Sequence, residues 1–346
     1  MLTLNNTNCL RRDKAFQWRP LYCTCHGWLQ TNAPGQSSGI FIVTEKQSYR
    51  LGFWLAIGAA VGFSAKAIFV KLAYQVPTGI PGLSHVDAVT LLALRMMFAA
   101  PAFGIAALRT RSAGTLTSRQ WLALVGVGLA GYYGASILDF WGLIFISAGL
   151  ERLILFTYPS LTLLLGILFF GKRMSGRDGA ALALTYLGIA AAFAHDLSIA
   201  EDSRAIWLGA GLVFASSLSY AIYLAGGGEL ISRLGSVRFA ALSMAVATGA
   251  TLLHYLVARP WSEVFSQPWP IYALAAGMAL FSTVIPVFMQ SAAIKQIGAG
   301  RASMIGMLGP VATLAMGWTL LDEPISAWQI GGALLVIAGV VLIGRK

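Results

Sequence analysis

Ten apolar segments, each long enough to cross a lipid bilayer, follow one another from residue 51 onward. A membrane-spanning helix needs about 20 consecutive and mostly apolar residues. Windows of this kind lie approximately at residues 51–73, 87–108, 119–141, 150–170, 178–195, 205–226, 238–258, 270–291, 302–320 and 327–344. Short connections separate them and leave little room for a water-soluble domain. The sequence therefore predicts an all-α membrane protein with ten transmembrane helices.

The composition of the chain agrees with a location in lipid. Of its 346 residues, 57% are hydrophobic and only 11% are charged, whereas roughly 25% of the residues of a soluble domain are charged. The formal net charge of +11 does not indicate nucleic-acid binding, because Lys and Arg lie in short loops and form no basic stripe with interleaved aromatic residues. We expect membrane lipid and a small-molecule substrate as partners, no nucleic acid, and either a monomer or a homodimer.

Residues 1–50 differ from the rest of the chain, since they are polar and contain no apolar run that could span a membrane. They include all three cysteines, Cys9, Cys23 and Cys25. The stretch 23–26 lacks a second ligand pair at zinc-finger spacing, so a disordered tail is favoured over a metal site. A second interpretation is a mis-started segment, with the true start at a non-AUG codon such as that of Val43. We expect no cofactor and no metal.

The two halves of the apolar region, residues 51–196 and 205–344, share an internal repeat. One shift of 151 residues aligns glycines and prolines of the halves, namely Gly149 with Gly300, Pro159 with Pro310, and Gly188 with Gly339. Because each half contains an odd number of spans, the second copy enters the membrane in the opposite orientation. The sequence therefore predicts two inverted five-helix repeats.

The distribution of Lys and Arg predicts which loops are cytoplasmic. One set of loops holds Arg109, Arg111, Arg119, Lys172, Arg173, Arg177, Arg233, Arg238, Lys295, Arg301, Arg345 and Lys346. The other set holds only Arg152, Arg204 and Arg259, together with the acidic Asp196, Glu201, Asp202, Glu263, Asp322 and Glu323. The positive-inside rule assigns the first set to the cytoplasm. We expect both termini to be cytoplasmic, in a bacterial inner membrane.

Three ionisable residues lie inside the predicted spans: Lys66, Arg95 and Asp139. Such groups cost several kcal/mol in lipid unless they are paired or hydrated. By helical rise the three lie at similar depth in the outer half of the membrane, and their surplus positive charge suits a substrate carboxylate. Two interpretations of Lys66 remain open, a structural ion pair or a substrate contact. Asp139 could instead take up a coupling proton.

Further candidates for substrate binding are polar groups on otherwise apolar helices, Tyr158, Tyr220 and Gln290. Aromatic residues at such positions commonly pack or lie in the interfacial belt, so a cavity role is one of two interpretations. Gly166 to Arg173 nearly matches a phosphate-binding loop, but its middle residues end an apolar helix where the motif needs a turn. With no zinc-protease motif and no nucleophile elbow, we expect no catalytic residues.

The sequence resembles the drug/metabolite transporter superfamily, in its ten-helix type with two EamA domains. The resemblance rests on Lys71, Leu94-Arg95, Ala148-Gly149, Tyr158-Pro159, Gly300, Gly309-Pro310 and Leu321-Asp322-Glu323-Pro324. The first copy departs from the pattern, with Lys172 where Glu is usual. The resemblance implies a helical bundle that exposes a central cavity alternately to each side. We expect a proton-coupled secondary exporter of small metabolites or drugs; the alternatives are a passive channel or membrane sensor and an intramembrane enzyme.

Overall fold

The computed structural model of the chain describes residues 45–80, 83–110, 116–170, 176–199, 202–297, 302 and 305–344. The expectations for the polar N-terminal segment up to residue 44, a tail without a metal or a mis-started stretch, lie outside these residues. Residues 45–50, which the sequence analysis counted with that segment, belong to the first helix. This helix therefore begins before the apolar window that predicted it.

The described part of the chain is almost entirely helical. Its first half forms α1 (Glu45–Gln75), α2 (Ala88–Arg109), α3 (Ser118–Gly128), α4 (Ala135–Gly142), α5 (Ala148–Leu155), α6 (Tyr158–Phe170) and α7 (Gly176–Ile199). Its second half forms α8 (Ser203–Leu234), α9 (Ser236–Ala258), the short 3-10 helix η2 (Trp261–Phe265), α10 (Trp269–Ala279), α11 (Ile285–Ile297), α13 (Gly309–Leu321) and α14 (Ala327–Gly344). A small antiparallel hairpin of β1 (Pro77–Ile80) and β2 (Leu83–His85) connects α1 to α2 and pairs Pro77 with His85.

Eight of the described helical stretches are long and apolar enough to cross a membrane. They are Tyr49–Gln75, Ala88–Arg109, Ser118–Gly142, Ala148–Phe169, Gly179–Ser198, Ser203–Gly228, Ser236–Ala258 and Trp269–Ile297. Two shorter apolar helices, Gly309–Leu321 and Ala327–Gly339, follow them. The prediction of an all-α membrane protein is therefore confirmed, and each predicted window overlaps one of these ten stretches.

Polar residues fix where several helices begin. The Asp87 carboxylate accepts hydrogen bonds from the Val89 and Thr90 amides at the start of α2, and Ser147 accepts one from the Leu150 amide at the start of α5. Such side chains satisfy amides that have no partner within the helix. In lipid this matters more than in water, because no solvent replaces a missing partner.

Two spans are interrupted midway by a turn of π-helix. The segments are η1 (Leu129–Gly134), between α3 and α4, and η3 (Leu280–Val284), between α10 and α11. Their first residues are 151 positions apart (280 − 129 = 151), and so are the first residues of α6 and α13 (309 − 158 = 151). A π-turn inserts one extra residue and often marks a functional site. Here both insertions lie beside the same cavity.

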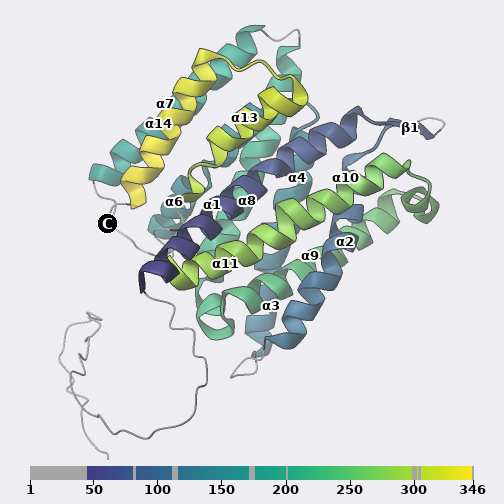
Figure 1. Cartoon of the computed structure of the whole chain (residues 1–346), viewed down its shortest axis with the longest axis horizontal. Coiled ribbons are helices and arrows are strands. Elements are labelled where there is room, and N and C mark those ends of the chain that lie inside the picture. The colour runs from purple at the N-terminus through teal and green to yellow at the C-terminus, as the bar shows by residue number, and fades with distance from the viewer. Residues whose placement is uncertain are drawn as a thin grey trace, which may run out of the picture. The chain divides into compact units, whose positions relative to one another are not determined.

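Helices from the two halves of the sequence pack against each other. In Figure 1, α7 and α14 run side by side, and α1 lies along α11. Small residues permit the closest approach: a Cβ atom added to Gly188 of α7 would lie 2.6 Å from the Gly332 carbonyl oxygen of α14. Close packing of this kind replaces the hydrophobic effect as the force that joins helices in lipid.

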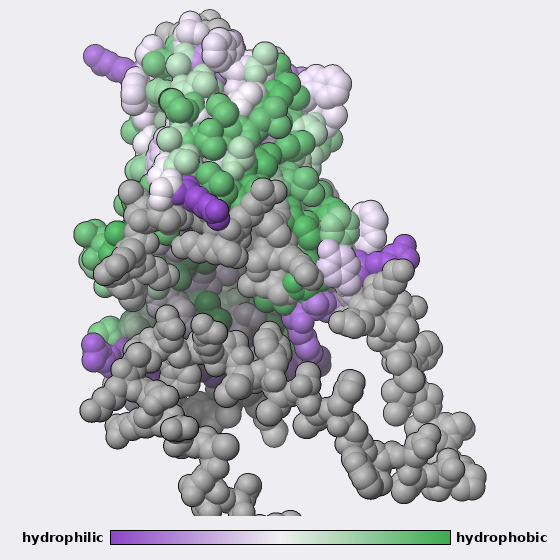
Figure 2. Space-filling model, turned by 90° about the vertical axis from the view of Figure 1, so that its left-hand side faces the viewer, coloured by the Kyte–Doolittle hydropathy of each residue, from purple (hydrophilic) through white to green (hydrophobic). Residues whose placement is uncertain are grey.

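The outer surface of the bundle is apolar. Figure 2 shows a broad hydrophobic area on one face. Large apolar side chains such as Leu187, Phe169, Leu334 and Val257 are exposed. An apolar surface that extends over several helices is the kind that lipid chains cover.

Candidate functional site

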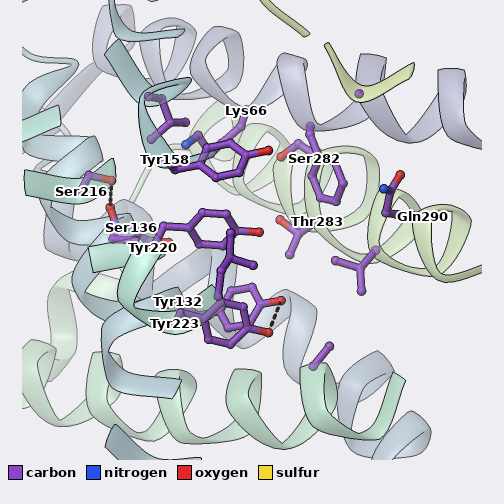
Figure 3. A pocket seen from close by; sticks show the side chains of 18 of the residues that line it. Lys66, Tyr132, Ser136, Tyr158, Ser216, Tyr220, Tyr223, Ser282, Thr283 and Gln290 are labelled. Atoms are coloured by element: carbon purple, nitrogen blue, oxygen red, sulfur yellow. Dashed lines mark hydrogen bonds between the residues drawn. The ribbon is translucent and has the colours of Figure 1, made fainter. Parts of the chain in front are cut away.

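A cavity of about 380 Å³ lies inside the bundle. Residues of α1, α2, η1, α4, α5, α6, α8, α9, η3 and α11 line it, so both halves of the sequence contribute to its wall. Figure 3 shows its polar side chains. A volume of this size is typical of sites for small molecules.

Lys66 of α1 enters this cavity with two carboxylates behind it. Its Nζ lies 2.7 Å from Oδ2 of Asp139 on α4 and 3.5 Å from Oε1 of Glu151 on α5. Both carboxylates are buried, with exposed side-chain fractions of 1% and 0%. One ammonium therefore joins three helices and offsets one of the two carboxylate charges, which are costly inside a membrane.

Arg95 of α2 reaches the cavity without a carboxylate partner. Its Nε donates to Oγ1 of Thr283 at 3.1 Å and its Nη1 donates to Oγ of Ser136 at 3.3 Å. The guanidinium also lies over the ring of Phe140, 5.6 Å from its centroid. Among the described residues no carboxylate lies within 4.0 Å of it, so two hydroxyls and one aromatic face are its neutral partners.

Arg152 of α5 has a similar environment on another side of the cavity. It is 6% exposed, its Nη2 donates to Oγ of Ser64 at 3.1 Å, and its guanidinium lies 5.6 Å from the ring centroid of Phe156. Its buried Nε has no hydrogen-bond partner in the described part of the chain. A second guanidinium thus lines the cavity, with one donor that has no partner among the described residues.

Aromatic rings form a continuous wall from α5 to α9. Ring centroids are 5.9 Å apart for Phe156 and Tyr158, 5.2 Å for Tyr158 and Tyr220, 5.7 Å for Tyr220 and Tyr223, and 5.2 Å for Tyr223 and Phe239. In Figure 3 the hydroxyls of Tyr158 and Tyr220 point toward Ser282 and Thr283. The cavity therefore has an aromatic wall, which we define as these five rings.

Hydroxyl and amide groups of η3 and α11 form the opposite wall. Ser282, Thr283 and Gln290 all line the cavity. Both hydroxyls bond to the carbonyl of Met278, at 2.7 Å and 3.2 Å. The wider π-turn lets two successive side chains share one carbonyl, and this places Thr283 where it accepts from Arg95.

The cavity reaches one end of the bundle. Its lining continues to Ile231 and Ser236, beside the junction of α8 and α9. Toward the other end, polar contacts close the bundle: the Tyr74 hydroxyl donates to the Phe140 carbonyl at 2.8 Å, and the Glu323 carboxylate accepts from the Ala148 amide at 3.1 Å. We name the first the open end and the second the sealed end, and we propose below that the cavity is accessible from the first.

Five of the six residues that the sequence nominated line this cavity: Lys66, Arg95, Tyr158, Tyr220 and Gln290. The sixth, Asp139, does not line it and instead contacts Lys66. The structure thus brings all six together around one space. Whether they bind substrate stays a prediction.

Two charged residues lie elsewhere than predicted. Arg152 and Asp196 were predicted to be external loop charges, but Arg152 lies buried on α5, and Asp196 is 9% exposed on α7 and accepts from Gln329 Nε2 at 3.2 Å. Glu151 was not predicted as a partner of Lys66. The available signal was Ser147, a helix cap that places the start of the helix at Ala148, two residues ahead of the predicted span.

Comparison with known proteins assigns the chain to a family. The sequence matches the EamA-like transporter family over residues 50–194 and again over residues 207–345. The chain belongs to this family. The predicted resemblance is therefore confirmed, and the protein is a multi-pass membrane transporter of small molecules.

Relatives of this transporter are described as a transporter, an efflux pump and an exporter. An uncharacterized transporter of Bacillus subtilis is 32% identical over 83% of this chain and 91% of its own length. A "probable amino-acid metabolite efflux pump" of Escherichia coli is 24% identical over 56% of this chain and 67% of its own. A "probable terminal-alkyne amino-acid exporter" of Streptantibioticus cattleyicolor is 23% identical over 78% and 85%. A solved crystal structure shares the fold at a TM-score of 0.56 and 14% identity, over 87% of this chain and 97% of that one.

Proposed function

We propose that this transporter is a secondary exporter that carries small metabolites by alternating access. The observation that carries the proposal is the cavity itself: helices of both halves wall it, and it continues to the open end while polar contacts close the sealed end. An alternating-access carrier passes through such a state, in which its site is accessible from one side of the membrane, before the site becomes accessible from the other side. A channel would need a path through both ends.

The proposal includes two inverted five-helix repeats. Two features support it beyond the sequence matches. The π-turns η1 and η3 recur 151 residues apart. The packing also recurs: α1 lies against α10, η3 and α11, as α8 lies against α3, η1 and α4, while α2 pairs with α9 and α7 with α14. A two-fold operation that exchanges the repeats would exchange these pairs.

We place both termini in the cytoplasm of a bacterial cell and the transporter in the inner membrane. After Arg152 is removed from the external loops, twelve basic residues stand against two, Arg204 and Arg259. The positive-inside rule then assigns the α8–α9 junction, and with it the open end, to the cytoplasm. A cavity open to the cytoplasm is the loading state of an exporter, which agrees with the relatives described as efflux proteins.

Within the cavity, we assign substrate binding to Lys66, Arg95, Tyr158, Tyr220 and Gln290. Asp139 acts through Lys66, whose ammonium it holds at 2.7 Å. The group of Lys66, Asp139 and Glu151 carries a formal charge of −1, and one proton would neutralise it. Since an uncompensated charge is unfavourable inside a membrane, this group is our proposed site for proton coupling.

Counterflow in proteoliposomes tests the proposal. Proteoliposomes are preloaded with an unlabelled metabolite extract. We expect it to drive saturable accumulation of labelled compounds, which remain chemically unchanged. Non-saturable equilibration would indicate a channel, and chemically altered products an enzyme. For proton coupling, an imposed pH gradient should change the rate in the wild type and not in Asp139→Asn. Equal stimulation of the wild type, Asp139→Asn and Glu151→Gln would exclude this group as the proton site.

A further inference from the structure

The cations of the cavity fall into two kinds. Lys66 has two carboxylate partners within 4.0 Å. Arg95 and Arg152 are 5% and 6% exposed, and in the described part of the chain neither has a carboxylate within that distance. A charge buried in a membrane without a counter-ion is costly. Neither guanidinium therefore contacts an anion directly. The −1 charge of the group of Lys66, Asp139 and Glu151 offsets one of them at longer range, and one positive charge is left without a counter-ion.

The cavity presents no acidic group to a bound molecule. Lys66, Arg95 and Arg152 are among its lining residues, whereas no Asp or Glu of the described chain is. Asp139 and Glu151 lie behind Lys66 and are already paired with it. Over these five groups the formal charge is +1. A substrate ammonium would meet cations and find no carboxylate to accept it.

Arg152 lines the cavity beside the aromatic wall. Its guanidinium lies over Phe156, the first ring of that wall, which continues through Tyr158 and Tyr220. A molecule held at Arg152 by a carboxylate would rest its body along these rings. Offset and edge-to-face contacts between aromatic rings favour a flat, apolar body in that place.

From these contacts we propose that the substrate is an organic monoanion, an aromatic carboxylate without an ammonium group, bound through Arg152 with Arg95 as the second cation. This inference rests on the proposed function and specifies its substrate class. It separates this transporter from relatives described as acting on amino acids, which carry an ammonium group as well. A membrane potential that is negative inside would also drive an anion outward, by about 2.3 kcal/mol per charge per 100 mV.

The test uses three probes with one phenyl body: phenylpropionate, phenylalanine and phenylethylamine. They carry respectively a carboxylate, both charged groups, and an ammonium only. Binding to the purified full-length transporter in detergent is measured by titration calorimetry. We expect phenylpropionate to bind at least about tenfold more tightly than phenylalanine, and phenylethylamine not to bind. Equal affinity for phenylalanine, or no binding of phenylpropionate, would overturn the proposal.

Variants assign the effect to the arginine. Arg152→Gln should weaken phenylpropionate binding about 30-fold or more, because it removes one member of a desolvated charge pair. Arg152→Lys should retain part of the affinity, and it covers the case in which Arg152→Gln does not fold. Arg204→Gln, at an exposed arginine on α8, is the matched control and should bind as the wild type does. Unchanged binding in both Arg152 variants would refute the assignment.

Counterflow of the same probes separates this inference from the proposed function. Binding of phenylpropionate without counterflow of any compound would support the anion site and refute the proposed carrier function. Saturable counterflow of other metabolites, with no preference for the anion in the binding assay, would leave the carrier standing and remove the anion site.

Discussion

The two ends of the bundle differ in what holds them together. At the sealed end, polar contacts join elements far apart in sequence: Tyr74 with Phe140, Glu323 with Ala148, and Asp196 with Gln329. At the open end the cavity continues to Ile231 and Ser236. Polar side chains close one end, and a carrier can exchange such contacts without unfolding.

A second contrast lies just inside the sealed end. Lys66 is held by Asp139 and Glu151, whereas Arg152, one residue after Glu151, has no carboxylate within 4.0 Å among the residues that the structure describes. Glu151 thus stabilises the bundle through Lys66, and the adjacent Arg152 is available to a ligand. Two consecutive residues of α5 therefore have different roles, one in stability and one in binding.

The largest effect on stability is expected when Lys66 is replaced. Lys66→Met leaves Asp139 and Glu151 buried without a cation, and we expect it to lower the free energy of unfolding by about 3–5 kcal/mol. Asp139→Asn keeps the pair between Lys66 and Glu151 at 3.5 Å and should lose much less. Melting temperatures in detergent at matched expression compare the two. An equal loss in both variants would show that the two carboxylates do not share the lysine.

A smaller effect is expected at the start of α5. Glu323→Ala removes the carboxylate that accepts from the Ala148 amide, which should cost about 1–2 kcal/mol. Because this contact closes the sealed end, the variant should also label faster at Ser64→Cys, a residue that is fully buried in the wild type. A lower melting temperature with an unchanged labelling rate would mean that Glu323 stabilises the fold without closing that end.

The smallest effect is expected at the rim of the sealed end. Arg259 Nε lies 3.6 Å from Oδ2 of Asp87, and its side chain is 33% exposed. Solvent screens such a pair, so Arg259→Gln should change the free energy of unfolding by less than about 1 kcal/mol. Chemical denaturation of the purified variant measures it. A loss as large as that of Lys66→Met would contradict the ranking of contacts by burial.

Much of the architecture could be read from apolar windows. A run of about 20 apolar residues has few alternatives to a spanning helix, and hence the predicted class was right. The interruptions were not predicted, because hydropathy does not respond to a single inserted residue: the π-turn of η1 contains the ordinary apolar and aromatic residues 129–134. Its consequence, the presentation of side chains to the cavity, is visible only in three dimensions.

The candidate site was predicted in part, and for a similar reason. Lys66, Arg95 and Asp139 stood out because each lies far inside an apolar window. Arg152 lies near the edge of one, where a loop charge is the ordinary interpretation. The structure buries it on α5, where its guanidinium contacts Ser64 and Phe156. Sequence alone does not give that tertiary position.

The central claim is a binding cavity that is open to one side of the membrane at a time. Its most direct test is a single cysteine at Ser291, which lines the cavity, in a variant without the three native cysteines. A membrane-impermeant maleimide should label it rapidly in inverted vesicles and slowly in intact cells, and phenylpropionate should protect it. Equally fast labelling from both sides, with no protection, would contradict the account.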